Sequence, residues 1–182
     1  MKTTLFIPTR NEIEAMQVIM PQIDRSWVDQ ILVADYSTDG TADYARSQGY
    51  DVIEQKGKGI RWAYIEAFPH VRGDVVITFS LDGNSPVRSI PLLIEEMKKG
   101  YDMVIASRYL PPAKSEDDDP MTAFGNWLFT HSINLLHGHS WRRPYTDAMV
   151  IYRAYRTQLF YELDLHKEES YTPEKWFGTL LG

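Results

Sequence analysis

The feature that most constrains this fold is a regular alternation of short apolar runs with segments of helical spacing, which extends from the N-terminus to Tyr109. The apolar runs have the length of buried strands and cover 3–8, 30–35, 51–55, 73–82 and 102–109. The segments with helical periodicity are 12–20, 42–49, 60–68 and 90–100. This alternation predicts parallel crossover units, and hence an α/β domain wound on a mostly parallel sheet.

The alternation stops after Tyr109. An acidic, proline-bounded stretch at 111–120 is expected to form an exposed loop, and a longer helical pattern follows at 123–138. Residues 147–165 have the pattern of a strand and then a helix, and 172–182 begin another apolar helical pattern without a cap. We therefore expect one domain over 1–182, and we expect the natural chain to continue beyond Gly182.

Composition excludes several classes of function. There is no cysteine, so disulfides, thiolate zinc sites and cysteine nucleophiles are excluded. The net charge of -6 argues against general nucleic-acid binding, because that binding needs a basic face to neutralise phosphates. No apolar run has the length of a membrane span and no signal peptide is recognisable, so we expect a cytoplasmic protein, soluble or peripheral to a membrane.

Polar side chains follow three of the expected strands at the point where each strand ends. They are Thr9, Asn11 and Glu12, then Asp35, Ser37 and Asp39, and finally Ser80, Asp82 and Asn84. Because the carboxyl ends of parallel strands meet at one edge, where such sheets bind ligands, we expect the carboxylates to gather there. A plainer interpretation gives Ser37 and Asp39 to turns and Glu12 to a helix start, and for Asp39 we prefer the turn.

Asp82 and Asn84 form a candidate metal site at this edge. Carboxylate and amide oxygens suit Mg²⁺ or Mn²⁺, which keep water and substrate phosphate as their other ligands. An ordinary Asp-Gly turn explains the same residues equally well. The KGKG segment at 56–59 permits close approach to a phosphate, although a solvated turn is the plainer interpretation. Neither a Walker loop nor a GxGxxG motif is present.

Taken in order, these segments resemble the family 2 glycosyltransferases, in particular the dolichyl-phosphate mannose synthase-like branch. FIPTRNE resembles the opening strand motif, LVADYSTDGT the nucleotide-contacting segment, GKGIRWAYIEAF the GKG helix and VIASRY the GSRY strand. FGNWLFTHSINLLHG with DAMVIYRAYR resembles the acceptor-side segment. The resemblance covers nearly the whole chain and implies a three-layer, Rossmann-like glycosyltransferase A-type fold.

The resemblance implies an inverting glycosyltransferase that moves a sugar from a UDP- or GDP-sugar to an acceptor, either a lipid phosphate such as a polyprenyl phosphate or a glycan. It further implies Mn²⁺ or Mg²⁺ as cofactor and peripheral association with a membrane. Residues 1–109 would form the nucleotide-sugar-binding half, and 120–182 the acceptor-side half.

The same resemblance implies which residues contact the donor. They are Pro8, Thr9, Glu12, Asp35, Ser37, Lys58 and Asp82, with Asp82 and Asn84 as metal ligands. Ser80 stands where the family has its first metal-motif aspartate, and Ala34 where it has the first of its paired aspartates. Loss of one carboxylate should weaken binding of a divalent ion, because affinity depends on ligand charge.

On the acceptor side the resemblance implies roles for Ser107 and Arg108. Arg142 and Arg143 are further candidates to hold an acceptor phosphate. Asp147 is the candidate base, acting with Asp82 as a catalytic residue, although a helix cap or an ion pair with Arg142 or Arg143 explains it nearly as well.

The helical pattern at 123–138 carries an apolar stripe, which faces either lipid or the core, and we expect the core. Its members are Trp127, Phe129, Ile133, Leu135 and Leu136. His137 and His139 look like a metal pair but lack a placed third ligand, so we expect them to be surface residues.

Two other functions compete with this interpretation. A nucleotidyltransferase that makes nucleotide sugars would also combine an α/β sheet with a divalent ion. It normally has a glycine-rich basic loop after the first strand, where this chain has PTRNEIEA, which disfavours it. A non-catalytic nucleotide-sugar-binding domain is the second alternative, suggested by Ser80 and by the abrupt C-terminus.

Overall fold

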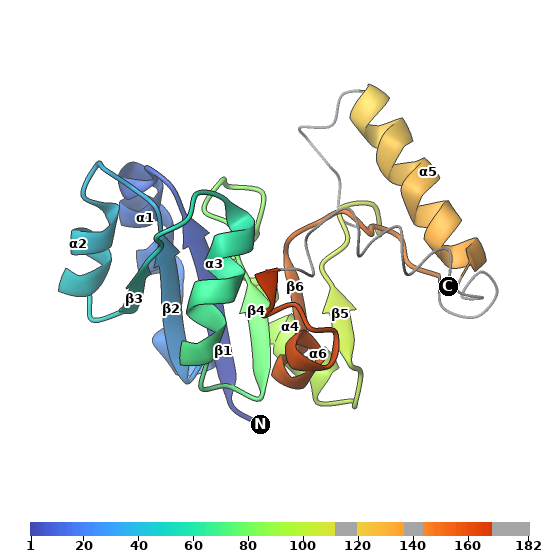
Figure 1. Ribbon diagram of the computed structural model, residues 1–182. Coiled ribbons are helices and arrows are strands. Elements are labelled where there is room, and N and C mark those ends of the chain that lie inside the picture. The colour runs from blue at the N-terminus through green and yellow to red at the C-terminus, as the bar shows by residue number, and fades with distance from the viewer. Residues whose placement is uncertain (112–119, 137–143, 169–182) are drawn as a thin grey trace.

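A mixed sheet runs through the middle of the computed structural model, which describes residues 1–111, 120–136 and 144–168 (Figure 1). The strands of the described residues are β1 Thr3–Thr9, β2 Gln30–Asp35, β3 Asp51–Glu54, β4 Val75–Thr78, β5 Met103–Ile105 and β6 Arg153–Arg156. They lie in the order β3-β2-β1-β4-β6-β5. The pairs among β1 to β4 are parallel, whereas β6 runs antiparallel to both of its neighbours. The expected α/β class with a mostly parallel sheet is confirmed.

Helices cover both faces of this sheet and make three layers. One face carries α1 Ile13–Ile19, α2 Thr41–Ser47 and α4 Ser89–Met97, and the other carries α3 Ile60–Ala67 and α6 Thr157–Glu162. Short 3-10 turns follow at η1 Met20–Gln22, η2 Arg25–Trp27 and η3 Phe68–His70. The remaining helix, α5 Pro120–Leu136, stands away from the sheet (Figure 1).

The central strands are apolar on both sides because both faces are covered. Leu5 and Ile7 of β1 pack in the cluster that faces α1 and α4, while Phe6 packs with Phe68 on the opposite face. Phe68 also stacks on Phe160 of α6, with ring centroids 3.6 Å apart. These fully buried side chains hold the strands in register and so fix where their carboxyl ends lie.

Three expected strands are shorter than the sequence pattern predicts. The run 73–82 pairs as β4 only over Val75–Thr78, and 102–109 as β5 only over Met103–Ile105. Of the strand expected after residue 147, only β6 pairs in the sheet. The guanidinium of Arg153 donates to the carbonyls of Ala148 and Val150, which lie in the part of that expected strand that does not pair.

Helix α5 exposes apolar side chains and buries polar ones. Trp127 is 53% exposed and Phe129 is 52% exposed, whereas Asn126 and Thr130 are each 2% exposed. The expectation that the apolar stripe of this helix packs in the core is therefore wrong for its exposed members. None of the described helices has the length and apolar character needed to cross a bilayer.

The buried polar residues attach α5 to the segment before β6. The amide of Asn134 donates to the carbonyl of Tyr145 and accepts from its N–H, both at 2.8 Å. The hydroxyl of Thr130 accepts from the N–H of Ala148 at 3.1 Å. Buried polar groups need such partners, so these bonds explain why the polar side of α5 faces inward.

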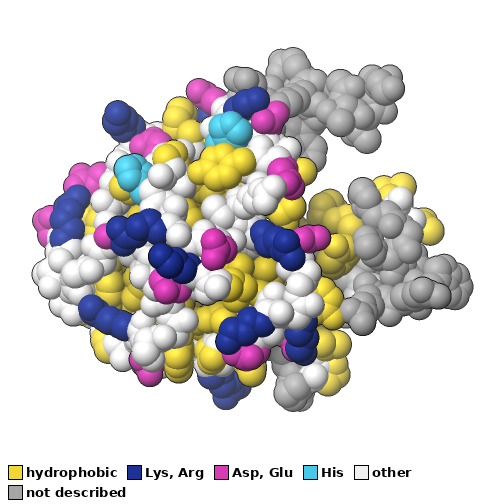
Figure 2. All heavy atoms as spheres, turned by 90° about the horizontal axis from the view of Figure 1, so that it is seen from below, with side chains coloured by type: hydrophobic (Ala, Val, Ile, Leu, Met, Phe, Trp, Pro, Cys, Tyr) yellow, Lys and Arg dark blue, Asp and Glu magenta, His cyan; other side chains and the backbone are white. Residues whose placement is uncertain are grey.

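The surface of the sheet and its covering helices differs from the surface of α5 in its charged side chains. Figure 2 shows one face on which basic and acidic side chains lie interspersed. The 17-residue helix α5 contains no Asp, Glu, Lys or Arg at all. Large exposed apolar patches are typical of interaction surfaces, so α5 is a candidate for one.

Candidate functional site

The ends of β1 and β2 form a closed polar cluster around Asp35. Thr9 and Asp35 are register partners, and the Thr9 hydroxyl donates to Asp35 Oδ1 at 2.6 Å. The Ser37 N–H donates to Asp35 Oδ2 at 3.0 Å, and the Ser37 hydroxyl donates to Oδ1. Pro8 pairs with Ala34 one step earlier in the ladder. A buried carboxylate held by three donors is fixed in position at this edge of the sheet.

Hydrogen bonds join the loop that follows β1 to the loop that follows β2. Asn11, with a left-handed φ of 56°, donates its N–H to Ser37 Oγ at 2.7 Å. Asp39 accepts from the backbone and hydroxyl of Thr41 and from the N–H of Ile13. The turn interpretation of Asp39 is confirmed. These bonds leave Glu12, at the start of α1, facing the same edge as Asp35.

Glu12 experiences the combined charge of the acids at this edge. Burial, followed by the charges of Asp82, Asp35 and Asp39, raises its pKa from 4.5 to about 7. Its Oε2 atom is buried and has no hydrogen-bond partner among the described residues. The carboxylates that follow β1, β2 and β4 therefore share one electrostatic site, as parallel strands require.

Asp82 and Asn84 lie on an exposed turn after β4. The Asn84 N–H donates to Asp82 Oδ1 at 2.9 Å, and Gly83 has φ of 85°. Among the described residues, no three His, Asp or Glu side chains group closely enough to hold a metal. One carboxylate and one amide nevertheless fit Mg²⁺ or Mn²⁺ ligated mainly by phosphate and water. The raised pKa of Glu12 beside Asp82 also fits a bound cation.

The KGKG segment is held as a rigid loop between β3 and α3. The N–H groups of Lys56 and Gly57 donate to the carboxylate of Glu66, at 2.9 and 3.1 Å. The Trp62 ring covers Gly57 so closely that a Cβ there has no room. Lys58 is exposed and makes no hydrogen bond or ion pair with the described carboxylates. The loop opens at the same strand edge because β3 is parallel to β2.

At the site predicted to bind the acceptor, Arg108 and Asp147 form a partly buried ion pair. Arg108 Nε donates to Asp147 Oδ2 at 2.8 Å, its Nη2 to Oδ1 at 3.1 Å, and its backbone N–H to Oδ2 at 3.2 Å. Asn126 Nδ2 adds a fourth bond, to Oδ1 at 3.1 Å. Asp147 is fully buried.

Burial raises the pKa of Asp147, but the hydrogen bonds and charge of Arg108 outweigh that effect and hold the pKa below its ordinary value. This geometry favours positioning of Arg108 over proton abstraction by Asp147. The expected partners of Asp147, Arg142 and Arg143, lie outside the described residues, as do His137 and His139. The base role of Asp147 stays a prediction.

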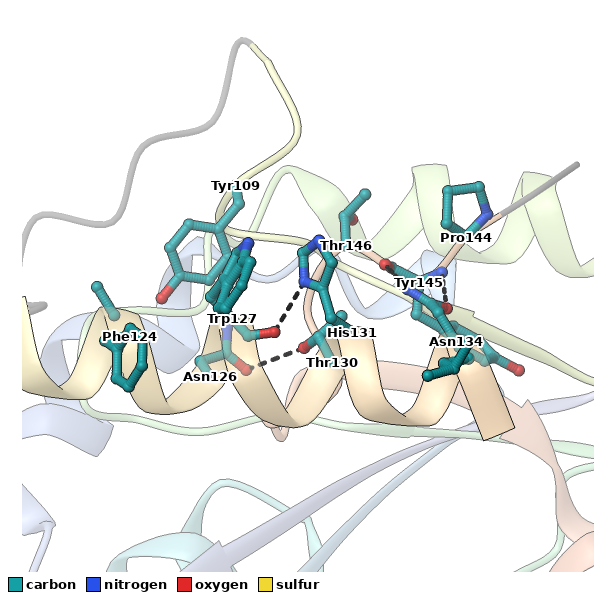
Figure 3. Close-up of a pocket in the computed structure, with 12 residues that line it drawn as sticks. Tyr109, Phe124, Asn126, Trp127, Thr130, His131, Asn134, Pro144, Tyr145 and Thr146 are labelled. Carbon is teal, nitrogen blue, oxygen red and sulfur yellow. Dashed lines mark hydrogen bonds between the residues drawn. The ribbon is translucent and has the colours of Figure 1, made fainter. Parts of the chain in front are cut away.

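A cavity of about 920 Å³ begins beside this ion pair and runs along α5 (Figure 3). The guanidinium of Arg108 lies 5.4 Å from the ring centroid of Tyr109, which lines the cavity. Thr146, another lining residue, donates its hydroxyl to Ser107 Oγ at 2.7 Å. Sequence reasoning missed Tyr109 and the polar side of α5. The signal for the latter was present, as Asn126, Thr130 and Asn134 recur every four residues in a helix without charges.

One buried side chain connects the segment after the Asp82 turn to the segment before β6. The hydroxyl of Tyr152 donates to the carbonyl of Pro86 at 3.1 Å, and its ring contacts Phe79 edge-on. Tyr152 precedes β6, whereas Pro86 follows the turn of Asp82. The two candidate half-sites therefore lie on one packed framework.

Comparison with known proteins identifies several relatives. The chain is 35% identical over 142 residues to the dolichol-phosphate mannosyltransferase of Pyrococcus furiosus, covering 73% of this chain and 38% of that protein. It is 28% identical over 185 residues to the undecaprenyl-phosphate 4-deoxy-4-formamido-L-arabinose transferase of Pectobacterium carotovorum, covering 93% and 54%. The chain thus spans about half or less of the length of these curated relatives.

Among solved structures, the fold is similar to that of glucosyl-3-phosphoglycerate synthase from Mycobacterium tuberculosis in complex with Mn²⁺, UDP and phosphoglyceric acid. The TM-score is 0.65 at 18% identity, over 89% of this chain and 58% of the other. The expected glycosyltransferase A-type fold is confirmed. The profile of glycosyl transferase family 2 matches residues 4–164. Since this match covers most of the sequence, the chain belongs to glycosyl transferase family 2.

Proposed function

We propose that the chain forms the catalytic domain of an inverting glycosyltransferase, which moves a sugar from a nucleoside diphosphate sugar to a polyprenyl phosphate. The observation that carries this proposal is the electrostatic site at the carboxyl edge, where Asp82, Asp35 and Asp39 act on a partly buried Glu12. Such a site favours a divalent cation, and with it an anionic diphosphate. Family membership disfavours the nucleotidyltransferase alternative.

The donor would lie across the ends of β1, β2 and β4. Asp35, fixed by Thr9 and Ser37, would accept hydrogen bonds from the base or ribose of a UDP- or GDP-sugar. Pro8 and Lys58 complete the proposed pocket. Asp82 and Asn84 would hold Mn²⁺ or Mg²⁺, which when bound neutralises the charge that develops on the departing diphosphate. The similar synthase was solved with Mn²⁺ and UDP.

The acceptor proposal rests on Arg108 and on the relatives. Both curated relatives are named as transferases of a polyprenyl phosphate, dolichol phosphate in one case and undecaprenyl phosphate in the other. An ionised phosphate oxygen needs no strong base, so a buried, charge-paired Asp147 is compatible with this acceptor. Asp147 would orient Arg108, and Arg108 with Ser107 would receive the phosphate. Arg142 and Arg143 remain predicted partners of that phosphate.

Peripheral membrane association is part of this proposal. A polyprenyl acceptor resides in a bilayer, so the acceptor side must reach its surface. Helix α5, whose Asn126 bonds to the partner of Arg108, exposes large apolar side chains, including Phe129 and Leu136. Exposed apolar area of this kind supports adsorption to the headgroup and acyl boundary. The cytoplasmic location stays a prediction.

The donor site is tested with UDP, GDP and dTDP in the presence and absence of Mn²⁺. Ligand that binds only the folded state stabilises it, by about 2.7 kcal/mol at 100 times Kd, so one nucleotide should raise the Tm by several degrees. Asp82→Ala should remove the Mn²⁺-dependent part of the increase. Asp102→Ala, at the opposite edge of the sheet, is the matched control and should leave it intact.

The absence of a Tm increase with every nucleotide would end the donor-site proposal. Ser80 keeps a second candidate open, a domain that binds a nucleotide sugar without transferring it. That candidate predicts the same Tm increase but no release of nucleoside diphosphate from any nucleotide sugar when polyprenyl phosphate is added. Release that depends on the acceptor would exclude it.

A further inference from the structure

The cavity along α5 is lined almost entirely by rings, alkyl groups and hydroxyls. Its lining contains no Asp, Glu, Lys or Arg among the described residues. The rings of Phe124 and Trp127 stack with centroids 5.9 Å apart, and Trp127 contacts His131 at 4.4 Å. These side chains form a continuous wall on one side of the helix (Figure 3). Such a wall offers a ligand apolar contact and no charge.

The polar groups in the lining already have partners within the protein. Asn134 bonds both backbone groups of Tyr145, and the Thr130 hydroxyl accepts from the Ala148 N–H. His131 Nδ1 lies 2.8 Å from the carbonyl of Trp127. A sugar or a nucleotide would have to compete with these bonds, whereas a hydrocarbon would not. The lining therefore selects an apolar ligand.

One end of the cavity coincides with the proposed phosphate site. Tyr109 lies in the lining and under the guanidinium of Arg108. Asn126 lies in the lining and donates to Asp147, the partner of that guanidinium. The cavity thus joins a cation at one end to an uncharged, aromatic groove along its length, which matches a molecule with an anionic head and a hydrocarbon tail.

We infer that this groove binds the hydrocarbon chain of the acceptor next to its phosphate, with Phe124 and Trp127 as the residues that recognise chain length. The inference rests on the proposed function, because the polyprenyl phosphate supplies both the head and the tail. The volume of about 920 Å³ is within the range of about 300–1,000 Å³ common to small-molecule sites. Several isoprene units would lie along α5, and the remainder of the chain would continue into the bilayer.

Helix α5 also supplies a matched control surface. Phe124, Trp127, His131 and Leu135 lie three or four residues apart and line the groove. Phe129 and Leu136 lie seven residues apart on a separate stripe, are similarly exposed, and do not line it. A ligand in the groove involves the first stripe only, whereas adsorption of the whole helix to lipid, or contact with a second copy of the chain, involves both.

The test is calorimetric titration with farnesyl phosphate and with the shorter dimethylallyl phosphate, both below their critical micelle concentrations. We expect farnesyl phosphate to bind the unaltered protein at least tenfold more tightly, because apolar area is buried. The double variant Phe124→Ser with Trp127→Ser should remove that preference and retain the affinity for dimethylallyl phosphate. The double variant Phe129→Ser with Leu136→Ser should keep the full preference.

Two results would overturn the groove. One is equal affinity for the two phosphates, and the other is an equal loss of preference in both double variants. Since every substituted side chain is exposed, the variants should keep the Tm of the unaltered protein. If a nucleotide with Mn²⁺ still raises the Tm while chain length has no effect, the groove fails and the donor proposal stands. If chain length matters but no nucleotide binds, the donor proposal fails and the groove stands as a lipid site.

Discussion

The carboxyl edge of the sheet and helix α5 both bury polar side chains, but they differ in whether their apolar side chains are buried. At both places buried polar groups bond to one another, Asp35 with Thr9 and Asn126 with Asp147. At the edge, the apolar neighbours pack into the core, whereas α5 leaves Trp127 to solvent.

Within the described residues, the edge therefore gathers negative charges and the helix exposes apolar surface. At the edge, burial and then the negative charges of Asp82, Asp35 and Asp39 raise the pKa of Glu12 to about 7. The helix carries more apolar surface than its own core covers. Under the proposed function, the edge binds a cation with a diphosphate, and the groove along α5 binds a hydrocarbon.

The largest effect that tests this comparison is expected at Asp147, which joins α5 to the sheet. Asp147→Ala removes the carboxylate that pairs with the partly buried guanidinium of Arg108, and removal of one partner of a buried pair costs about 3–5 kcal/mol. We expect a loss of about 3 kcal/mol in the free energy of unfolding, measured by urea denaturation, and a smaller loss for Asp147→Asn.

The control is Asp102→Ala, which removes an ion pair with Arg156 in which both side chains are about half exposed or more. Exposed pairs contribute about 0–1 kcal/mol, so this variant should stay close to the unaltered protein. Similar losses in the two variants would mean that Asp147 is not a structural connection between α5 and the sheet.

A smaller effect, of order 2 kcal/mol, is expected at Glu12. Its folded pKa of about 7 exceeds the unfolded value of 4.5, so the folded state binds more protons between the two values. The contribution to stability is complete below the unfolded pKa and is lost as the pH rises to about 7. Glu12→Gln should remove this loss, and urea denaturation at about pH 5 and about pH 8 should show it as a difference between variant and unaltered protein.

The expected effect of about 2 kcal/mol already allows for solvent screening, since Glu12 is only partly buried. Adding Mn²⁺ with the nucleotide that binds should shrink the difference, because a cation near Asp82 favours the ionised carboxylate. A Glu12→Gln variant with the same pH dependence as the unaltered protein would contradict the shared electrostatic site.

The smallest expected change in the free energy of unfolding comes from substitutions at two neighbouring residues of α5. Thr130→Val removes a buried hydroxyl that accepts from Ala148, which should cost about 1–2 kcal/mol. Phe129→Ser replaces an exposed ring and should change the free energy of unfolding by less than about 0.5 kcal/mol. Thermal unfolding of the two variants in the absence of lipid would check this order, and the reverse order would show that α5 packs its apolar face in solution.

The fold of the sheet half could be predicted well from the sequence because each strand is recognisable from its own residues. Strands buried on both faces read as apolar runs, and the polar residues after them, Thr9, Asp35 and Asp82, necessarily reach one edge when the strands are parallel. The place of β6 between β4 and β5 was not predictable in this way, because an antiparallel return has no signature in the spacing of the earlier strands.

The proposed acceptor half was predicted less well because its contacts join residues that lie far apart in the sequence. The pair of Asp147 with Arg108 joins residues 39 positions apart, and nothing near either residue in the sequence distinguishes Arg108 from Arg142. The core assignment for Trp127 failed for a related reason. An apolar stripe indicates that a helix face will be covered, but it does not indicate whether protein or another material covers it.

The antiparallel pairing of β5 with β6 has a consequence for how this scaffold varies. Ile105 and Arg153 are register partners, so the chain leaves the sheet at one rung of the ladder and re-enters at the same rung. Everything between them is topologically a single insertion with adjacent ends. Under the proposed function, exchange of that insertion would change which molecule receives the sugar and would leave Glu12, Asp35 and Asp82 in place.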